Sequence, residues 1–418
     1  MTLPRPIFTA FTVLFAAMSA SAAEQVVTLK DNDVWVMAGD SITAQRQHTN
    51  FIEAYYRTRH PKLNLHFRNS GIGGNTTGSV RARFDYDVAA WKPTIVSIEL
   101  GMNDVGGAQE NYIKGMKELI EKIRAIPAQP VLISSSPVDD GSVMGDWKSP
   151  RCEKIHPFTD ALKKLAEEEK VVFVDQYHPL IDVWGQNRRK GAEAAAAKGV
   201  PPPPAGAPAP AKPVIPPSLI PLGGDPVHPG PVGQYTMAAT ILAGLKADGD
   251  VSSATLSADG KEMMSSGCKI TEVSAKGGKL AFTRLDQTSP WPILPAAKTA
   301  IQVLPQMLNL SKYTLQITGL PEGNYRVTVN GKPGATVSSK DLAAGWNATT
   351  ALDERSAKIL GLIAKLQGKL NTDWRAASKE KNEANLAAAQ KAIEECEKEI
   401  QAACQPEPLH FEIEKDSR

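Results

Sequence analysis

Four short polar segments of the sequence contain residues that could do chemistry. Two of them are Gly39-Asp40-Ser41, which follows an apolar run directly, and the glycine-rich segment Asn69–Thr76. A serine at a strand-to-helix turn sits at a helix N-terminus, where its backbone N–H can bind an oxyanion. Glycines let backbone N–H groups approach a ligand closely. Taken singly, both segments are ordinary turn composition, and serine is also a favoured N-cap.

The other two segments supply an amide and an imidazole. Asn103, within Gly101–Asp104, is a neutral donor suited to a developing oxyanion, although capping a helix is its other common role. His228 lies three residues after Asp225. Histidine is the usual general base for a serine, and a nearby carboxylate can fix its tautomer. A lone Asp and His are usually surface loop residues, so the signal is the order of all four segments.

The elements around these residues alternate strand-like and helix-like patterns from Val34 to about Leu245. Amphipathic stretches, such as 112–123 and 158–169, separate the apolar runs. The strand candidates are the five apolar runs Val34–Met37, Leu63–Phe67, Thr94–Leu100, Val131–Ser134 and Val171–Val174. This alternation predicts an α/β fold with a parallel sheet covered by helices on both faces. Ligands bind outside the carboxyl ends of such strands, which is where the first three polar segments lie.

Together the four segments resemble the signature blocks of the SGNH hydrolases, also called the GDSL esterase/lipase family. The resemblance covers roughly residues 30–245. It implies a three-layer α/β/α sandwich of the flavodoxin-like SGNH type. It also implies a catalytic triad and an oxyanion hole whose members have counterparts here: nucleophile Ser41, partners Asp225 and His228, and oxyanion donors Ser41, Gly74 and Asn103.

The sequence departs from the family pattern in two places. Ile42 replaces the leucine of the family name, which is a mild change. An Ala- and Pro-rich insertion at 191–221 precedes Asp225 and holds ten of the 31 prolines. Its composition predicts an extended or disordered loop. It could be a domain linker, but Ser41 needs His228 from beyond it, so we expect a stiff lid or spacer within one catalytic domain.

The N-terminus has the pattern of a secretory signal. Residues 1–22 combine Arg5, an apolar stretch too short to span a bilayer, and small residues before a cleavage point. We expect an exported protein without a stable membrane anchor, with a hydrolase domain at 23–250 and an accessory α+β region at 251–418. The formal net charge of +2 argues against a nucleic-acid partner.

The accessory region has its own patterns. Strands are expected at 279–284 and 313–319, and 321–332 predicts a turn, a strand and an Asn-Gly β-hairpin. Apolar residues at helix spacing predict one or two long helices over 353–403 that pack against the body, or, as the alternative, against a partner. The four cysteines allow three disulfide pairings, and the sequence does not choose among them.

The remaining histidines and tryptophans give weaker signals. No histidine pairs with another ligand in a recognised metal motif, and there is no C-x-x-C pair, so neither a metal nor a cofactor is expected. His48 lies seven residues after Ser41 and could line the active-site pocket. Trp147, Trp184 and Trp291 could stack on sugar rings, although core packing is the more common use of tryptophan.

These observations predict an exported serine esterase that hydrolyses carboxylic esters of small molecules or polysaccharides. An appended domain without an amphipathic lipid-binding helix favours deacetylation of polysaccharides. The alternatives are a lipid-directed esterase of the lysophospholipase or thioesterase type, and a non-catalytic carbohydrate-binding protein on the same scaffold. The sequence leaves the oligomeric state open.

Overall fold

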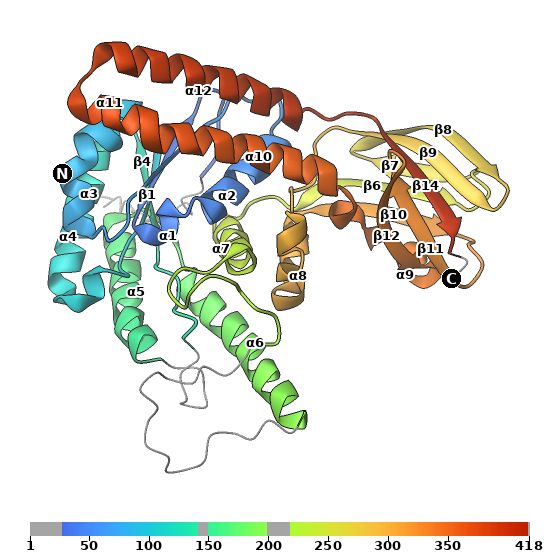
Figure 1. Cartoon of the computed structure of the whole chain (residues 1–418), viewed down its shortest axis with the longest axis horizontal. Coiled ribbons are helices and arrows are strands. Elements are labelled where there is room, and N and C mark those ends of the chain that lie inside the picture. Colours follow the sequence, from blue (N-terminus) through green and yellow to red (C-terminus); the bar gives the residue numbers. More distant parts are fainter. Residues whose placement is uncertain (1–26, 141–148, 199–217, 417–418) are drawn as a thin grey trace, which may run out of the picture.

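A five-stranded parallel sheet lies at the centre of the larger part of the molecule (Figure 1). The computed structural model describes residues 27–140, 149–198 and 218–416. The strand order is β2-β1-β3-β4-β5, and every neighbouring pair is parallel. The strands are β1 (Val34–Gly39), β2 (His66–Gly71), β3 (Ile95–Glu99), β4 (Gln129–Ile133) and β5 (Val172–Val174). The predicted α/β fold with a parallel sheet is therefore confirmed.

The second strand lies further along the chain than the apolar pattern predicts. β2 begins at His66 rather than Leu63 and continues through Asn69 and Ser70. Both polar side chains are buried, because the Asn69 amide donates to the backbone oxygen of Thr43 at 2.7 Å and the Ser70 hydroxyl to Asp87 at 2.9 Å. Because distant partners satisfy these polar side chains, they can be buried at the end of β2. The apolar pattern by which a strand is predicted is therefore missing from this part of β2.

Helices cover both faces of the sheet, which makes three layers. Side chains of alternate strand residues point to opposite faces, so Trp35 and Met37 enter one hydrophobic core while Val36 and Ala38 enter the other. One face is covered by α2 (Gln47–Arg59), α6 (Tyr177–Ala197) and α7 (Pro231–Gly244). The other is covered by α3 (Thr77–Asp87), α4 (Gln109–Arg124) and α5 (Pro150–Glu169).

The first part of the expected insertion is helical, contrary to the prediction of an extended loop. α6 continues through the alanine run to Ala197, because alanine is the strongest helix former. Residues 199–217, which hold nine of the ten prolines of this insertion, lie outside the described residues. Beyond this segment, Ile220 is held against α6 by Asn187. The Asn187 amide donates to the Ile220 carbonyl at 2.8 Å, and the Asn187 side-chain oxygen accepts the Ile220 backbone N–H at 3.0 Å.

Residues 250–347 and 409–415 form two further sheets that pack on each other. Their orders are β13-β10-β6-β7 and β12-β11-β14-β9-β8, and their facing side chains form a separate core. This region therefore contains more than the predicted hairpin. The strands are β6 (Asp250–Ser257), β7 (Met263–Ser266), β8 (Cys268–Lys276), β9 (Lys279–Asp286), β10 (Lys312–Thr318), β11 (Asn324–Val329), β12 (Lys332–Ser338), β13 (Trp346–Asn347) and β14 (Leu409–Lys415).

The predicted Asn-Gly hairpin joins β11 to β12. Asn330 and Gly331 both have positive φ, at 51° and 74°, as the tight turn between two antiparallel strands requires. The short helical elements are α1 (Ser41–Ala44), α8 (Ala300–Val303), α9 (Ser339–Ala344) and the 3₁₀ turns Ala89–Trp91, Asp104–Gly106, Pro295–Ala297, Pro305–Leu310 and Ala348–Ala351.

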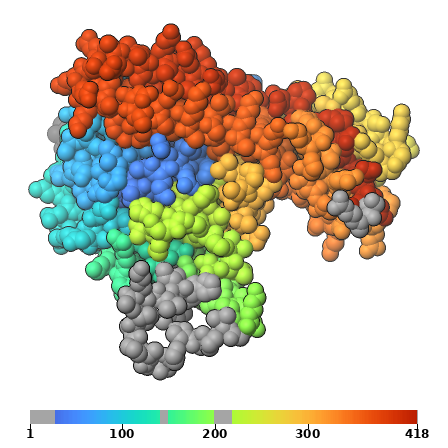
Figure 2. Space-filling model, in the orientation of Figure 1, coloured from blue at the N-terminus to red at the C-terminus, as the bar shows by residue number. Residues whose placement is uncertain are grey.

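A long helical hairpin connects the two parts of the molecule. It consists of α10 (Asp353–Lys369), a π-helical turn (Leu370–Trp374), α11 (Arg375–Glu380) and α12 (Glu383–Cys404), after which β14 returns to the sheets. Its apolar residues, among them Ile363 and Ile393, belong to the core of the α/β part. Figure 2 shows its orange-red surface lying over the blue α/β part, while the paired sheets project to one side. This is the predicted packing of long helices against the body.

Buried polar contacts hold this helical hairpin on the α/β part. Glu397 of α12 accepts from Arg68 at 2.6 Å, and Gln367 of α10 donates to Glu53 of α2 at 2.7 Å. Burial raises the pKa of Glu397, but its hydrogen bond with His66 and the charge of Arg68 outweigh burial and lower it to about 2. In the described part of the chain all four cysteines are free thiols. Within the same residues no helix is long and apolar enough to cross a membrane.

Candidate active site

Ser41 is the first residue of α1 and follows β1 after one intervening residue. That residue, Asp40, caps the helix by accepting the Ile42 amide at 2.9 Å. The turn from strand to helix is so close that a Cβ on Gly39 would lie 2.0 Å from the Thr43 hydroxyl oxygen and 2.9 Å from the Glu99 backbone oxygen. Only glycine fits there, so the Gly-Asp-Ser sequence places the serine at the carboxyl edge of the sheet.

His228 and Asp225 come from the loop that leads into α7. The Asp225 carboxylate accepts the backbone N–H groups of Val227 at 2.8 Å and His228 at 2.9 Å, which folds the segment into a tight turn. Gly224 has a φ of +69°, and a Cβ there would lie 2.0 Å from the His228 carbonyl oxygen. Glycine is therefore required for the turn that presents both side chains.

The three predicted triad residues form one hydrogen-bonded chain. His228 Nε2 lies 2.8 Å from Ser41 Oγ, and His228 Nδ1 lies 2.9 Å from Asp225 Oδ2. Burial raises the pKa of Asp225, but the hydrogen bonds from the backbone and the side chain of His228 together outweigh it, so this pKa lies below its usual value. The carboxylate is therefore ionised at neutral pH and can hold the imidazole with Nδ1 protonated and Nε2 facing the serine.

Asn103 and the glycine-rich segment lie on loops that meet beside Ser41. The Asn103 amide donates to the backbone oxygen of Asn75 at 3.0 Å and weakly to Asp40 at 3.4 Å. Gly74 has a φ of +72°, in the left-handed region that glycine adopts without strain, and the Ile72 amide donates to the Gly39 carbonyl at 3.2 Å. The loops after β1, β2 and β3 thus converge, as expected for their positions in a parallel sheet.

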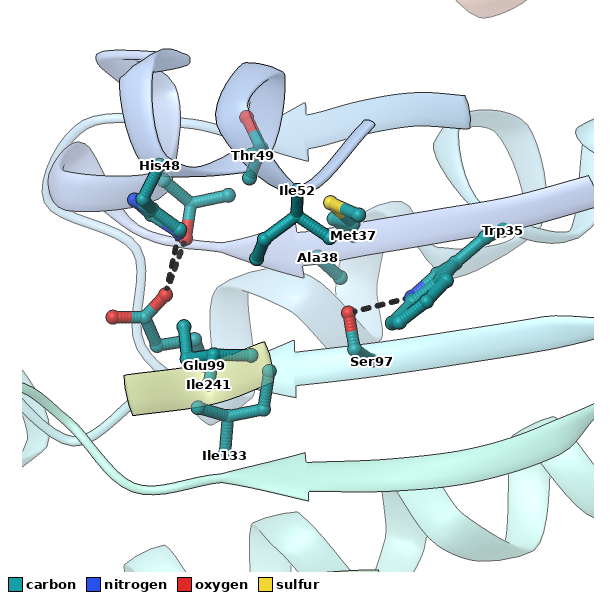
Figure 3. A pocket seen from close by; sticks show the side chains of 11 residues that line it. Trp35, Met37, Ala38, His48, Thr49, Ile52, Ser97, Glu99, Ile133 and Ile241 are labelled. Carbon is teal, nitrogen blue, oxygen red and sulfur yellow. Dashed lines mark hydrogen bonds and ion pairs between the residues drawn. The ribbon is translucent and has the colours of Figure 1, made fainter. Parts of the chain in front are cut away.

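A buried polar cluster packs against α1, where the Thr43 hydroxyl donates to Glu99 at 3.5 Å. His48 of α2 contacts Glu99 at the end of β3, with Nε2 3.0 Å from a carboxylate oxygen (Figure 3). Its other ring nitrogen lies 2.7 Å from the Gln234 side-chain oxygen. Burial lowers the pKa of His48, but the charge and hydrogen bond of Glu99 outweigh burial, so this pKa is raised. Because an acceptor oxygen faces each ring nitrogen of His48, Glu99 and Gln234 both stabilise the imidazolium form.

Asp40 belongs to the same cluster. Burial, followed by repulsion from Glu99, raises the pKa of Asp40 to about 7. Two carboxyls that share a buried site cannot both ionise cheaply, so the protonated form of Asp40 is favoured below that pH. Beside them, a cavity of about 10 Å³ is lined by Trp35, Ser97 and His48 among others, and is just large enough for one water.

The buried cluster also extends to the histidine loop. Gln234 donates to the Gln45 side chain at 2.8 Å, and Gln45 donates to the Pro229 carbonyl at 3.3 Å. Pro229, the residue after His228, is thus tied through two glutamines to the His48–Glu99 pair. Neither Glu99 nor Gln234 is among the residues that the sequence patterns predict for the site. The available signal for Glu99 was a charge at the end of an otherwise apolar central strand.

Several weaker predictions have different outcomes. His48 lines the small buried cavity between α2 and the sheet rather than an open substrate pocket. Trp184 and Trp291 are fully buried, so stacking on sugar rings is wrong for both, while Trp147 lies outside the described residues. Although no metal-ligand spacing was recognised, the structure brings His156, Asp160 and His178 together.

The match to a known protein family lies in the α/β part. Residues 37–234 match the model of the GDSL-like Lipase/Acylhydrolase family. These residues form a GDSL-like lipase/acylhydrolase domain. This GDSL domain contains Ser41 and His228, and its strands are those of the central sheet.

Individual relatives resemble parts of the chain. The acetylxylan esterase of Geobacillus stearothermophilus is 28% identical over 28% of this chain and 56% of its own length. The uncharacterized lipoprotein YqeF of Bacillus subtilis (strain 168) is 31% identical over 19% of this chain and 36% of its own length. The chain thus spans about half or less of these relatives.

A solved structure resembles the whole chain. BT4096, described as a gut microbial diltiazem-metabolizing enzyme, superimposes with a TM-score of 0.72 at 19% sequence identity. The match covers 94% of this chain and all of that one. At this level of identity the likeness concerns the fold, which includes the paired sheets and the helical hairpin.

Proposed function

We propose that this chain is an exported serine esterase that hydrolyses carboxylic esters at Ser41. The observation that carries the proposal is the hydrogen-bonded chain from Ser41 through His228 to Asp225, with contacts of 2.8 and 2.9 Å. The GDSL domain supports the same chemistry. Export rests on the signal-like segment at 1–22, which lies outside the described residues.

The proposed reaction is acyl transfer through Ser41. His228 Nε2 accepts the proton of Ser41 as Oγ attacks the ester carbonyl carbon. The oxyanion that forms is stabilised by the backbone N–H groups of Ser41 and Gly74 and by the Asn103 amide. His228 then donates its proton to the leaving alcohol. Water, deprotonated by His228, attacks the acyl-serine and releases the carboxylic acid.

For the substrate we favour acetyl esters of polysaccharides. The support is the acetylxylan esterase among the relatives, which is 28% identical over 28% of this chain. Acetate release from acetylated xylan, measured beside fatty-acid release from a phospholipid, distinguishes this substrate from a lipid. Faster release of fatty acid would replace the polysaccharide by a lipid ester and leave the serine mechanism in place.

The direct test of the mechanism is the variant Ser41→Ala, assayed on a short p-nitrophenyl ester. We expect turnover to fall by roughly 10⁴–10⁶-fold, because the nucleophile is removed. Labelling by a fluorophosphonate should disappear with it. The matched control is Ser265→Ala, which removes an exposed hydroxyl on β7 and should change neither readout. Undiminished turnover in Ser41→Ala, or a wild-type protein without a fluorophosphonate adduct, would contradict the proposal and favour the non-catalytic alternative.

A further inference from the structure

A second cluster of chemically competent side chains lies outside the Ser41 site. His156 and Asp160 are one turn apart on α5, and His178 is the second residue of α6. Their ligand atoms all lie within 4.8 Å of one another. His156 Nε2 is 3.3 Å from His178 Nε2 and 3.4 Å from Asp160 Oδ2, while His178 Nε2 is 3.9 Å from Asp160 Oδ1.

These separations fit a shared metal ion. Zinc binds imidazole nitrogen and carboxylate oxygen at about 2.0–2.1 Å in a tetrahedron, whose edges are then about 3.3–3.4 Å long. His156 Nε2 is separated by that length from both His178 Nε2 and Asp160 Oδ2. The 3.9 Å contact of His178 runs to the other oxygen of the Asp160 carboxylate, so Asp160 must turn for one of its oxygens to complete the set. The contact between the two imidazoles is longer than a normal nitrogen hydrogen bond. A direct bond therefore explains the approach of His156 and His178 less well than a common ligand does.

A carboxylate behind His178 orients this imidazole. Asp175 Oδ2 lies 2.7 Å from His178 Nδ1, and the same carboxylate accepts the His178 backbone N–H at 3.1 Å. This bond places the ring proton on Nδ1 and leaves the lone pair of Nε2 directed at His156. A carboxylate on the far nitrogen of a ligating histidine is the usual support of a protein zinc site.

We infer that His156, Asp160 and His178 bind a zinc-type divalent ion, with Asp175 as the supporting carboxylate. Two imidazoles and one carboxylate suit zinc and its neighbours in the first transition row, whereas calcium and magnesium prefer oxygen ligands alone. Three protein ligands leave the fourth tetrahedral position open. The ion joins the first turns of α5 to the first turn of α6.

The open position is accessible to a ligand. His156 and His178 line a cavity of about 290 Å³, whose wall also includes Tyr177, Asp182 and Arg189. Water or an oxygen ligand held in this cavity can therefore complete the coordination. The cluster shares no residue with the Ser41–His228–Asp225 chain, so ester hydrolysis at Ser41 does not require the ion.

The test is a titration of the tag-free full chain with Zn²⁺ alone, after stripping by a chelator and in competition with a chromophoric indicator. We expect one tight equivalent per chain, and Co²⁺ at the same site should give the intense visible absorption of a tetrahedral ion. His156→Ala and His178→Ala should each weaken binding by at least ~100-fold, and Asp175→Asn by ~10–100-fold. The matched control His410→Ala, which removes an exposed histidine of β14, should bind as the wild type does.

Folding does not confound this test. The side chains of His156, Asp160 and His178 are 53%, 60% and 40% exposed, so their loss leaves the core intact, which circular dichroism checks. Zn²⁺ binding that is no tighter in the wild type than in the double variant His156→Ala/His178→Ala overturns the inference. Several weak equivalents that persist in every variant overturn it as well, since they would indicate general surface binding.

Discussion

Two histidine–carboxylate pairs at the carboxyl edge of the parallel sheet lie in opposite environments. His228 and Asp225 meet at 2.9 Å with side chains 35% and 59% exposed, whereas His48 and Glu99 meet at 3.0 Å with side chains 2% and 7% exposed. Equal distances therefore do not mean equal energetics. Water screens the exposed pair, while the buried pair must offset the cost of removing two charges from water.

This difference in exposure leads us to expect a role in the reaction for the exposed pair and a role in holding the fold together for the buried pair. The exposed pair faces the serine hydroxyl and can exchange protons with substrate and solvent. The buried pair has no access to substrate, but it holds α2 against the end of β3 and, through two glutamines, reaches the loop of the exposed histidine. We therefore expect variants of the exposed pair to change the rate, and variants of the buried pair to change the free energy of unfolding.

The largest expected effect concerns the exposed pair. His228→Ala should reduce turnover of a p-nitrophenyl ester by roughly 10⁴–10⁶-fold, because the general base is lost. Its free energy of unfolding should change by about 1 kcal/mol or less, since the side chain is partly exposed. Turnover and urea unfolding measure the two effects. The exposed His410→Ala is the control for both, and a loss of stability without a loss of rate would reverse the proposed roles.

The buried pair should show the opposite pattern. Glu99→Ala leaves His48 in the interior without its carboxylate, and we expect a loss of about 3–5 kcal/mol in the free energy of unfolding by urea. Asp225→Ala, in the exposed pair, should lose only about 1 kcal/mol. The double variant His48→Ala/Glu99→Ala should lose less than the sum of the single variants. Strict additivity would mean that the two side chains do not stabilise each other.

The third expected effect is a change in the pH dependence of stability. Burial raises the pKa of Asp40 to about 7 from 3.8, so between these values the folded state holds a proton that the unfolded state has released. Stability from this group is therefore greatest at low pH and falls as pH rises toward 7, by about 1 kcal/mol per pH unit. The raised pKa of His48 acts in the same direction.

Asp40→Asn removes this titration and keeps a residue that can cap α1. The variant should gain stability relative to the wild type as pH rises from 4 to 7, in thermal or urea unfolding measured across that range. The matched control is Asp85→Asn, since that carboxylate is 89% exposed and should leave the profile unchanged. An Asp40→Asn profile parallel to that of the wild type would show that Asp40 is not a buried proton carrier.

Much of the α/β part was predictable because its signals are local. The apolar runs and the amphipathic stretches between them give the parallel sheet, and glycine, aspartate and asparagine mark the turns at its carboxyl edge. The proposed site residues were named from these turns. The prediction of a loop from residue 191 was wrong for the end of α6, because composition alone does not show where an alanine-rich helix ends and a proline-rich segment begins. β2 was misplaced because distant partners satisfy its polar residues.

The sequence by itself determined the order of strands and helices, the Asn-Gly hairpin and the loops that present Ser41, Asn103 and His228, since each depends on neighbouring residues. Only the tertiary structure decided what lies beneath and beside them. His228 meets Ser41 across 187 positions, Glu99 finds His48, and α12 brings Glu397 to Arg68. A charge or a histidine acquires its role from the groups packed around it, and those groups are brought together by folding rather than by spacing along the chain.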